Sequence, residues 1–401
     1  MEQEESAYIT SLHLKGYKSI RDVSVTLNKG LNILIGANGS GKTNFLEFLD
    51  AAYNDEYALL FSVTNKFETK ISDELFTIEL KGDRVVRNNI KNFAYSSTKT
   101  ILKGNHIGSF IYFFDEDKKM INIQKSNPEN LGSNFTKTLF LRFENPLSLI
   151  LKDKLAIELF FSADEDSYFW NSNLDIQSGT NTFLNTIFQI SYKNKSDQKD
   201  TNNITNQIQH EKWFSIDALC QNLKQFSPIK NIKIDWTLTR QSNLDEYDDA
   251  FTAILIQGID FQFNVNNEWV NWTQLSDGTK RLFYLIGSVT YAKENEIILI
   301  EEPELGVHPH QLSLLMNFLM SKSAHNQIII STHSPQVLNS LGEDELDNII
   351  VARHEGKEGT KMYHLSEEEK GYATEYMKNV GFLSDYWMMS GFMQEENPEY
   401  I

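Results

Sequence analysis

Apolar and polar residues alternate along the chain in patterns typical of strands and helices. Near the start, residues 8–14 (YITSLHL) and 23–27 (VSVTL) alternate at every second position, which predicts half-buried strands. Residues 31–35 (LNILI) form an almost continuous apolar run, which is typical of a strand buried in a parallel sheet. Residues 43–53 then carry apolar side chains at helical spacing, so a helix is expected after the glycine-rich loop between them.

The strand pattern continues over residues 74–123 and returns after residue 231. The elements expected in the last third are a helix over 276–291, a strand at 297–300, a helix near 310–321, a strand at 328–330 and a helix from Pro335. Strands that alternate with helices predict the α/β class. We expect a mixed sheet covered by helices, together with a β-rich subdomain.

Residues 144–230 break this alternation. They contain few glycines that would mark turns, and they carry helix-like stretches at 183–190 and 214–223, separated by a polar stretch. We therefore predict a mainly helical insertion over 144–230. It would separate an N-terminal lobe (1–143) from a C-terminal lobe (231–401).

Composition narrows the class of protein. The length of 401 residues suggests two or three domains, or one domain with a large insertion. The 40% of hydrophobic residues is enough to form a sizeable core. The net charge of −18 argues against a protein that binds nucleic acid over its whole surface. A local basic patch could still bind nucleic acid. A single cysteine, Cys220, excludes an intrachain disulfide. The first residues are polar and acidic, and no apolar run approaches the ~20 residues that span a bilayer, so a cytoplasmic protein is expected.

The glycine-rich loop at 36–43 matches the phosphate-binding pattern G-x-x-x-x-G-K-[ST] between a predicted strand and a predicted helix. Gly36, Gly39 and Gly41 would let the backbone curl so that its N–H groups face one anion. Lys42 would place its ammonium on the β- and γ-phosphates, and the Thr43 hydroxyl would bind magnesium. A glycine-rich turn without a ligand is the alternative, which both flanking elements disfavour. ATP and Mg²⁺ are the expected cofactors.

Three further segments carry candidate chemistry. Glu301 and Glu302 end the strand at 297–300, where one carboxylate can hold magnesium and the other can polarise an attacking water. In a parallel sheet this strand end would lie beside the phosphate loop. The strand at 328–330 leads to His333. Ser276, in an LSDG turn, is a predicted helix N-cap whose neighbouring N–H groups could meet a second phosphate.

The order of these four elements resembles an ATP-binding-cassette (ABC) type of ATPase. The specific likeness is to the branch that contains RecF, SMC proteins and the OLD (overcoming lysogenization defect) ATPases. The resemblance covers about residues 8–55 and 270–355, in GLNILIGANGSGKTN, LSDGTKRL, IEEPELGVHP and STHSP. It implies a Walker A loop formed by Gly36, Ala37, Asn38, Gly39, Ser40, Gly41, Lys42, Thr43 and Asn44.

The same resemblance implies roles outside the loop. Glu301 would bind magnesium, Glu302 would be the general base for water, and His333 would contact the γ-phosphate. Ser276 and Gly278 would form the signature motif, which contacts the ATP held by another protomer. Asp277 departs from the commoner LSGG signature.

The resemblance also bears on two further segments. Leu305 and Gly306, followed by His308-Pro309, would form the loop that crosses the dimer interface. His308 and His310 are also a conceivable metal pair, but no third ligand is near in the sequence, and a loop with a helix start is favoured. The Q-loop, which usually carries a glutamine, could lie at either of two places in this sequence. Gln124 is one, and residues 139–146 (LFLRFENP), which contain no glutamine, are the other.

The resemblance predicts an ATPase that acts through a separate effector. Many OLD relatives carry a C-terminal Toprim nuclease, but the 401 − 333 = 68 residues after His333 are too few for one. We expect an ATP-driven switch that forms a homo-oligomer from head-to-tail dimers and controls a separate nuclease or toxin. The ATPases of the PARIS and Septu anti-phage systems have this architecture.

Two alternatives remain open. One is a RecF- or SMC-like ATPase of DNA repair; the absence of a long coiled coil counts against an SMC protein, and the net charge of −18 counts against a DNA clamp. Binding of nucleic acid is compatible with the favoured function but is not required by it. The other is a transporter ATPase subunit, which the insertion and the OLD-like opening disfavour. No membrane partner is expected.

Overall fold

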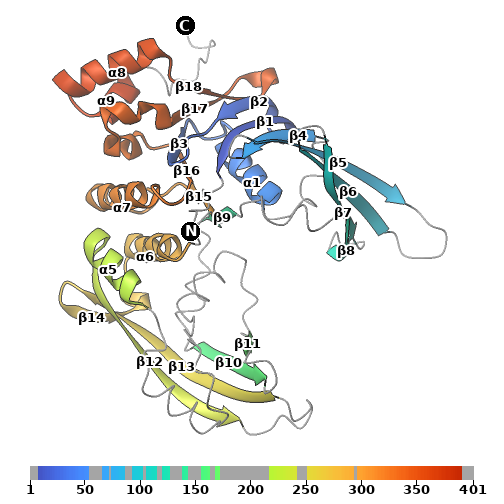
Figure 1. The fold of residues 1–401 in the computed structure, drawn as a ribbon. Coiled ribbons are helices and arrows are strands. Elements are labelled where there is room, and N and C mark those ends of the chain that lie inside the picture. The colour runs from blue at the N-terminus through green and yellow to red at the C-terminus, as the bar shows by residue number, and fades with distance from the viewer. Residues whose placement is uncertain are drawn as a thin grey trace, which may run out of the picture. The chain divides into compact units, whose positions relative to one another are not determined.

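The structure is a computed structural model, and it describes residues 8–53, 66–71, 74–85, 93–102, 105–114, 120–126, 138–142, 155–162, 168–171, 216–241, 251–292 and 296–390. The chain divides into two compact units (Figure 1). Unit 1 consists of Met1–Arg142, Ala292–Leu305 and Met316–Ile401, and unit 2 consists of Phe143–Tyr291 and Gly306–Leu315.

Unit 1 contains a six-stranded mixed sheet with the strand order β18-β17-β3-β16-β15-β9. The strands are β18 (Thr360–His364), β17 (Ile349–His354), β3 (Leu31–Ile35), β16 (Ile328–Thr332), β15 (Ile297–Glu301) and β9 (Thr138–Leu141). All are parallel except β18, which runs antiparallel to β17. β3 and β16 are buried at every position, as expected for central strands with both faces covered. The predicted α/β class with a mixed sheet is confirmed.

A second sheet in unit 1 is entirely antiparallel, with the order β2-β1-β4-β5-β6-β7-β8. Its strands are β1 (Ile9–Tyr17), β2 (Ile20–Thr26), β4 (Lys66–Ile71), β5 (Glu74–Val85), β6 (Phe93–Leu102), β7 (Asn105–Phe114) and β8 (Met120–Ser126). The strands predicted at the start of the chain and over 74–123 are therefore confirmed.

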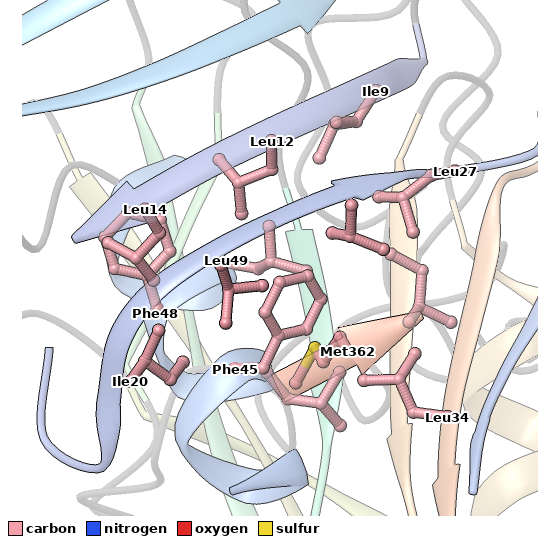
Figure 2. Packing of buried hydrophobic residues seen from close by; sticks show 14 of the residues in the cluster. Ile9, Leu12, Leu14, Ile20, Leu27, Leu34, Phe45, Phe48, Leu49 and Met362 are labelled. Atoms are coloured by element: carbon pink, nitrogen blue, oxygen red, sulfur yellow. The ribbon is translucent and has the colours of Figure 1, made fainter. Parts of the chain in front are cut away.

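Helix α1 (Lys42–Tyr53) is held in place by the core of unit 1. Phe45 and Leu49 of α1 pack into one buried cluster with Leu12 of β1, Leu34 of β3 and Met362 of β18 (Figure 2). Full burial of each such side chain contributes about 1.5–3 kcal/mol. The helix that begins at the phosphate loop is therefore fixed against both sheets.

Unit 2 contains a five-stranded sheet in which β11-β10-β13-β12 are neighbours and β14 also pairs with β13. Its elements are β10 (Leu155–Ser162), β11 (Tyr168–Asn171), α5 (Asp217–Phe226), β12 (Ile229–Gln241), β13 (Phe251–Val265), β14 (Glu268–Asn271), the 3₁₀ helix η3 (Trp272–Gln274) and α6 (Asp277–Thr290). In its core, the ring of Phe263 contacts those of Trp272 and Phe283 at centroid distances of 5.8 and 5.2 Å.

The described part of 144–230 differs from the mainly helical insertion predicted for it. The helix predicted over 214–223 corresponds to α5, but β10 and β11 are strands, and β10 pairs with β13. The run LAIELFFS of β10 is rich in aromatic and branched residues, which favour a strand once a partner strand is present. The predicted helical stretch at 183–190 lies outside the described residues. Residues 231–291, assigned from the sequence to the C-terminal lobe, share unit 2 with β10.

The remaining elements are α7 (Pro309–Lys322), the 3₁₀ helices η4 (Pro335–Ser340), η5 (Glu343–Asn348) and η6 (Gly356–Glu358), and the helices α8 (Glu367–Asn379) and α9 (Leu383–Met389). The helix predicted from Pro335 is a 3₁₀ helix of six residues, a type of helix that often connects other elements. None of the described helices is long and apolar enough to cross a membrane.

Candidate active site

The phosphate loop joins β3 to α1 in unit 1. Gly39 (φ +80°) and Gly41 (φ +96°) have left-handed backbone conformations that residues with side chains rarely adopt. A Cβ atom on Gly41 would lie 2.1 Å from the Thr360 hydroxyl oxygen, and one on Gly36 would lie 2.1 Å from the Ala352 carbonyl oxygen. β17 and β18 therefore approach the loop so closely that glycine is needed at both positions.

The loop has a second support at the start of α1. The Asn44 side-chain amide donates to Ser19 Oγ over 2.8 Å, and Ser19 Oγ shares a hydrogen bond of 2.8 Å with Thr360 Oγ1. Ser40 is buried inside the curl, whereas Asn38 is exposed at its tip. Because a helix N-terminus attracts anions, this fixed curl ahead of α1 is suited to bind phosphate.

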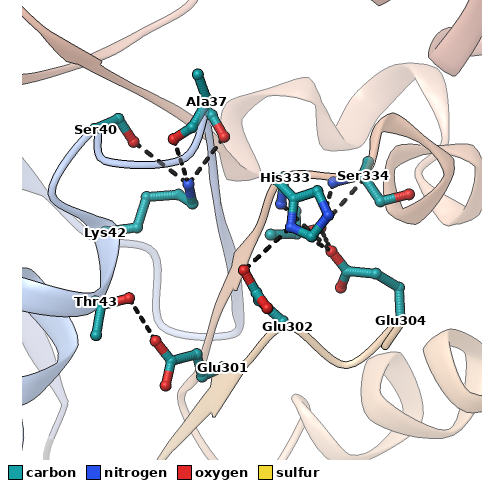
Figure 3. A network of polar contacts seen from close by, with 11 residues as sticks. Ala37, Ser40, Lys42, Thr43, Glu301, Glu302, Glu304, His333 and Ser334 are labelled. Atoms are coloured by element: carbon teal, nitrogen blue, oxygen red, sulfur yellow. Dashed lines mark hydrogen bonds and ion pairs between the residues drawn. The ribbon is translucent and has the colours of Figure 1, made fainter. Parts of the chain in front are cut away.

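Lys42 points into the curl of the loop (Figure 3). Its ammonium donates to the carbonyl oxygens of Gly36 and Ala37, each over 2.9 Å, and lies 3.4 Å from Ser40 Oγ. Lys42 is only 6% exposed, and this burial lowers its pKa, although the charges of Glu302, Glu304 and Glu301 oppose the shift. The charge is thus already placed where phosphate oxygens would meet the loop.

Thr43 and Glu301 lie against each other although 258 residues separate them in the sequence. The Thr43 hydroxyl, in the first turn of α1, donates to Glu301 Oε1 at the end of β15 (Figure 3). A hydroxyl and a carboxylate are the oxygen ligands that Mg²⁺ takes in nucleotide sites, where phosphates and water complete its coordination. No group of three or more His, Cys, Asp or Glu side chains that could hold a metal occurs among the described residues. The Thr43 hydroxyl and the Glu301 carboxylate fit a magnesium ion that is bound together with a nucleotide.

Glu302 and His333 form a second pair beside the loop. The Nδ1 atom of His333 lies 3.1 Å from Glu302 Oε1, directly after the ends of β16 and β15. The Glu302 backbone has φ +45°, a left-handed conformation that is strained for a residue with a side chain. Its N–H donates to the carbonyl of Ser331 over 2.8 Å, which helps to hold this conformation. Backbone strain of this kind is common at catalytic positions.

Glu304 is a site residue that the sequence patterns did not single out. Its Oε1 accepts hydrogen bonds from the Thr332 hydroxyl (2.6 Å) and the His333 backbone N–H (3.3 Å), and lies 3.6 Å from His333 Nδ1. The side chain is 9% exposed. Glu304 therefore ties the turn after β15 to the end of β16 and fixes His333. The available signal was a third carboxylate in IEEPEL, two positions after Glu302.

A chain of ion pairs behind the metal position was also missed. The guanidinium of Arg142, the residue after β9, contacts Glu47 of α1 and places its Nε 3.4 Å from Glu301 Oε2. Glu47 also pairs with Lys18. Burial alone would raise the pKa of Glu47, but hydrogen bonds from Lys18 and Arg142 lower it below its usual range. Nothing in the sequence links these residues, since only the order of strands brings them together.

The Q-loop candidates lie in different sheets. Gln124 lies on β8 in the antiparallel sheet, which is not the sheet of the phosphate loop. Segment 139–146 begins in β9, which pairs with β15, and its first residue after the strand is Arg142. The position next to the candidate metal ligand is therefore occupied by an arginine.

The signature residues Ser276 and Gly278 belong to unit 2, whereas the phosphate loop belongs to unit 1. Ser276 is the N-cap of α6, as predicted, and its hydroxyl oxygen accepts a hydrogen bond of 3.2 Å from the Thr279 N–H. A Cβ atom on Gly278 would lie 2.3 Å from the carbonyl oxygen of Gly306, the glycine of the predicted interface loop. The start of α6 and that loop are thus packed in direct contact.

His308 and His310 lie at the start of α7, where the His310 N–H is 3.3 Å from His308 Nδ1. Both are exposed, and the part of the chain that the structure describes brings no further metal ligand to them. This geometry agrees with a loop and a helix start.

Comparison with known proteins gives the family. The family described as "AAA domain, putative AbiEii toxin, Type IV TA system" matches residues 31–339, more than three quarters of the chain. The chain belongs to this family. The match spans the phosphate loop, Glu301 at the end of β15, Glu302 directly after that strand, and His333. Membership supports ATP binding and ATPase activity, whereas the narrower resemblance to OLD, PARIS or Septu ATPases stays a prediction.

Curated relatives of this AAA-family chain are distant. An "ATP/GTP phosphatase" of Helicobacter pylori (strain ATCC 700392 / 26695) is 21% identical over 392 residues, covering 90% of this chain and 93% of that protein. The DNA replication and repair protein RecF of Limosilactobacillus reuteri (strain DSM 20016) is 49% identical over 39 residues. The chain thus spans about a tenth of the length of the RecF proteins it matches.

Solved structures that are similar to this chain include SMC head domains. The SmcHead bound to the C-winged helix domain of ScpA has a TM-score of 0.46 at 15% identity, covering 91% of this chain and 99% of that chain. The head domain from Thermotoga maritima has a TM-score of 0.37 at 11% identity, covering 89% and 99%. The Smc head bound to a ScpA domain derived from Pyrococcus furiosus has a TM-score of 0.45 at 13% identity, covering 93% and 100%.

Proposed function

We propose that this AAA-family protein is an ATP-driven switch. It binds and hydrolyses ATP with Mg²⁺, forms a homo-oligomer and controls a separate effector protein, a nuclease or a toxin, in anti-phage defence. The observation that carries the nucleotide chemistry is the convergence of Lys42, the Thr43–Glu301 pair and the Glu302–His333 pair at the carboxyl ends of β3, β15 and β16. Ligands of α/β proteins bind at this edge of a parallel sheet.

Each residue has a chemical task in this proposal. Lys42 and the loop N–H groups bind the phosphate oxygens, while Thr43 and Glu301 would hold Mg²⁺, which neutralises phosphate charge when bound. Glu302 accepts a proton from the attacking water. The ring of His333 orients the Glu302 carboxylate and faces the terminal phosphate.

Two variants test this assignment. Glu302→Gln retains nucleotide binding but loses the base, so phosphate release should fall ~10²–10⁴-fold while calorimetric affinity stays near that of the wild type. Lys42→Met should lose affinity instead, since it removes the cation aimed at the phosphates. If turnover is unchanged in Glu302→Gln, another residue must be the general base, and Glu301 is the next candidate. Unchanged affinity in Lys42→Met would refute the phosphate-loop assignment.

The proposed oligomer shares its active sites between protomers. Ser276 and Gly278, at the N-terminus of α6, would face the γ-phosphate bound by a second protomer in a head-to-tail dimer. Mixing a Lys42→Met chain with a Ser276→Arg chain should then restore one intact site per heterodimer. Absence of recovered ATPase activity, with both chains folded and co-assembled, would refute the shared site.

The effector is the part of the proposal that rests on the family. Its description includes a toxin and a type IV toxin–antitoxin system, which supports a defence role in which an ATPase acts with a second protein. The net charge of −18 suits a basic partner, because complementary charges speed encounter. Nucleotide can control such a partner only if the partner binds the two states with different affinity.

A pull-down from the native host with the wild type and with Glu302→Gln tests this role. A stoichiometric partner whose amount changes with nucleotide state is expected. Nuclease activity of the purified chain alone would refute control in trans.

A second candidate function is a RecF- or SMC-like ATPase that binds DNA. The observation that favours it is the 49% identity over 39 residues with a protein named for DNA replication and repair. ATP-dependent binding to duplex DNA, weakening steeply with salt, would support this function. Absence of such binding at low salt, together with a nucleotide-sensitive protein partner, would favour the switch.

A further inference from the structure

Glu301 uses its two carboxylate oxygens in different directions. Oε1 accepts the hydrogen bond from the Thr43 hydroxyl, while Oε2 lies 3.4 Å from Nε of Arg142. The Arg142 Nε atom is buried and has no hydrogen-bond partner among the residues that the structure describes. Since a buried donor without an acceptor costs about 1–3 kcal/mol, a small movement of Glu301 toward Arg142 is favoured. Arg142 thus touches the one oxygen of Glu301 that does not face Thr43.

Besides Glu301, two side chains hold Arg142 in place. A terminal nitrogen of its guanidinium contacts Glu47, and Glu47 contacts Lys18 at the β1–β2 turn. The guanidinium carbon lies 4.5 Å from the centre of the Phe140 ring. An arginine fork restrained by a carboxylate and an aromatic ring has few other positions available. The position of the Glu301 carboxylate is therefore coupled to α1 and to the β1–β2 turn.

We propose that Arg142 is a positioning residue for the magnesium ligand Glu301, with Glu47 and Lys18 as its support. The inference rests on the proposed function, since it assumes that Thr43 and Glu301 hold the metal of a bound nucleotide. Arg142 holds Oε2, so that Oε1 stays aimed at the Thr43 hydroxyl and only one oxygen is presented to the metal. Carboxylates that bind metals are commonly restrained in this way, and loss of the restraint costs 10–100-fold in metal affinity.

A purely electrostatic role for Arg142 predicts the opposite sign. Lys18, Glu47, Arg142 and Glu301 together carry two positive and two negative charges. Removal of Arg142 leaves the group with a net charge of −1, which attracts a divalent cation more strongly. If charge alone mattered, Arg142→Met would bind magnesium more tightly and Arg142→Lys would resemble the wild type. If positioning matters, both variants bind magnesium more weakly, because lysine keeps the charge but lacks the fork.

The experiment is a Mg²⁺ titration of the binding of a non-hydrolysable ATP analogue, followed by calorimetry in the full chain. We expect the Mg²⁺ midpoint to rise ~10–100-fold in Arg142→Met and by a smaller factor in Arg142→Lys. Binding of the analogue in EDTA should not change, because Lys42 and the loop are untouched. Lys370→Met is the matched control: Lys370 also contacts two carboxylates, Asp347 and Glu367, but lies on α8 and not in the site. Its midpoint should equal that of the wild type.

A further variant tests the support. Glu47→Gln should raise the midpoint less than Arg142→Met, and the double variant should match Arg142→Met alone, since both act through one contact.

The outcomes separate this inference from the function on which it rests. A wild type without Mg²⁺-dependent binding of the analogue overturns both. If Arg142→Met and Arg142→Lys are folded and their Mg²⁺ midpoints equal that of the wild type or lie below it, the positioning role is overturned. The proposed ATPase function is not affected by that result. If Arg142→Met does not fold, as judged by thermal melting, Arg142→Lys decides. An equal rise in the Lys370→Met control would also overturn the proposal.

Discussion

Removal of the Glu304 carboxylate should destabilise unit 1, although the sequence analysis assigned no role to this residue. In Glu304→Ala, the Thr332 hydroxyl and the His333 N–H lose their common acceptor. Hydrogen bonds to a charged group contribute about 1.5–3 kcal/mol each, so about 3–6 kcal/mol is lost. The second oxygen of Glu304 is buried and has no hydrogen-bond partner in the described part of the chain. Its removal therefore recovers about 1–3 kcal/mol of desolvation cost. With the middle of each range, a loss of about 4.5 kcal/mol and a gain of about 2 kcal/mol, the expected net loss is about 2–3 kcal/mol.

Thermal denaturation followed by circular dichroism measures this loss. In a domain of this size each 1 kcal/mol lowers Tm by about 2–4 °C, so Glu304→Ala should melt about 5–10 °C below the wild type. Glu304→Gln keeps an acceptor oxygen in the same place and should lose less than half as much.

Glu302→Ala is the matched control for Glu304→Ala. It removes a carboxylate two residues away whose side chain is 28% exposed, and it should cost less than about 1 kcal/mol. If the Tm of Glu304→Ala equals that of the wild type, the structural role assigned to Glu304 is refuted. A Glu302→Ala protein that loses as much stability as Glu304→Ala would show that the effect is not specific to those two hydrogen bonds.

Three further predictions concern backbone strain, packing and pH. Glu302→Asn should increase the free energy of unfolding by up to about 1 kcal/mol and raise Tm slightly, because asparagine tolerates φ +45°. The same variant should lose phosphate release, because the base is gone. Gly278→Ala should cost about 1–3 kcal/mol in thermal melting, since its Cβ meets the Gly306 carbonyl at 2.3 Å, whereas Gly371→Ala in open space on α8 should gain about 0.5–1 kcal/mol. Burial lowers the pKa of Lys42, so calorimetric affinity for an ATP analogue should fall as pH rises toward 10.5, and Lys42→Met should show no such fall.

Local sequence determined the parts of this protein whose chemistry depends on neighbours in the chain. The phosphate loop, the buried strands β3, β15 and β16, and the Ser276 cap of α6 could be predicted because glycine spacing, apolar runs and capping residues act over a few positions. The same patterns placed Glu301, Glu302 and His333 at strand ends, beside the loop.

Tertiary structure alone decided which distant residues meet. β10 is a strand because β13 lies beside it, and hydrogen bonding to a partner strand is not encoded within either segment. Glu304 meets Thr332 because β15 and β16 are neighbours in the sheet. Arg142 meets Glu47 and Glu301 because β9 pairs with β15 beside α1, although 95 residues separate Arg142 from Glu47. Ion pairs and hydrogen bonds act over a few ångströms, so only the strand order, which sequence periodicity does not specify, brings such partners together.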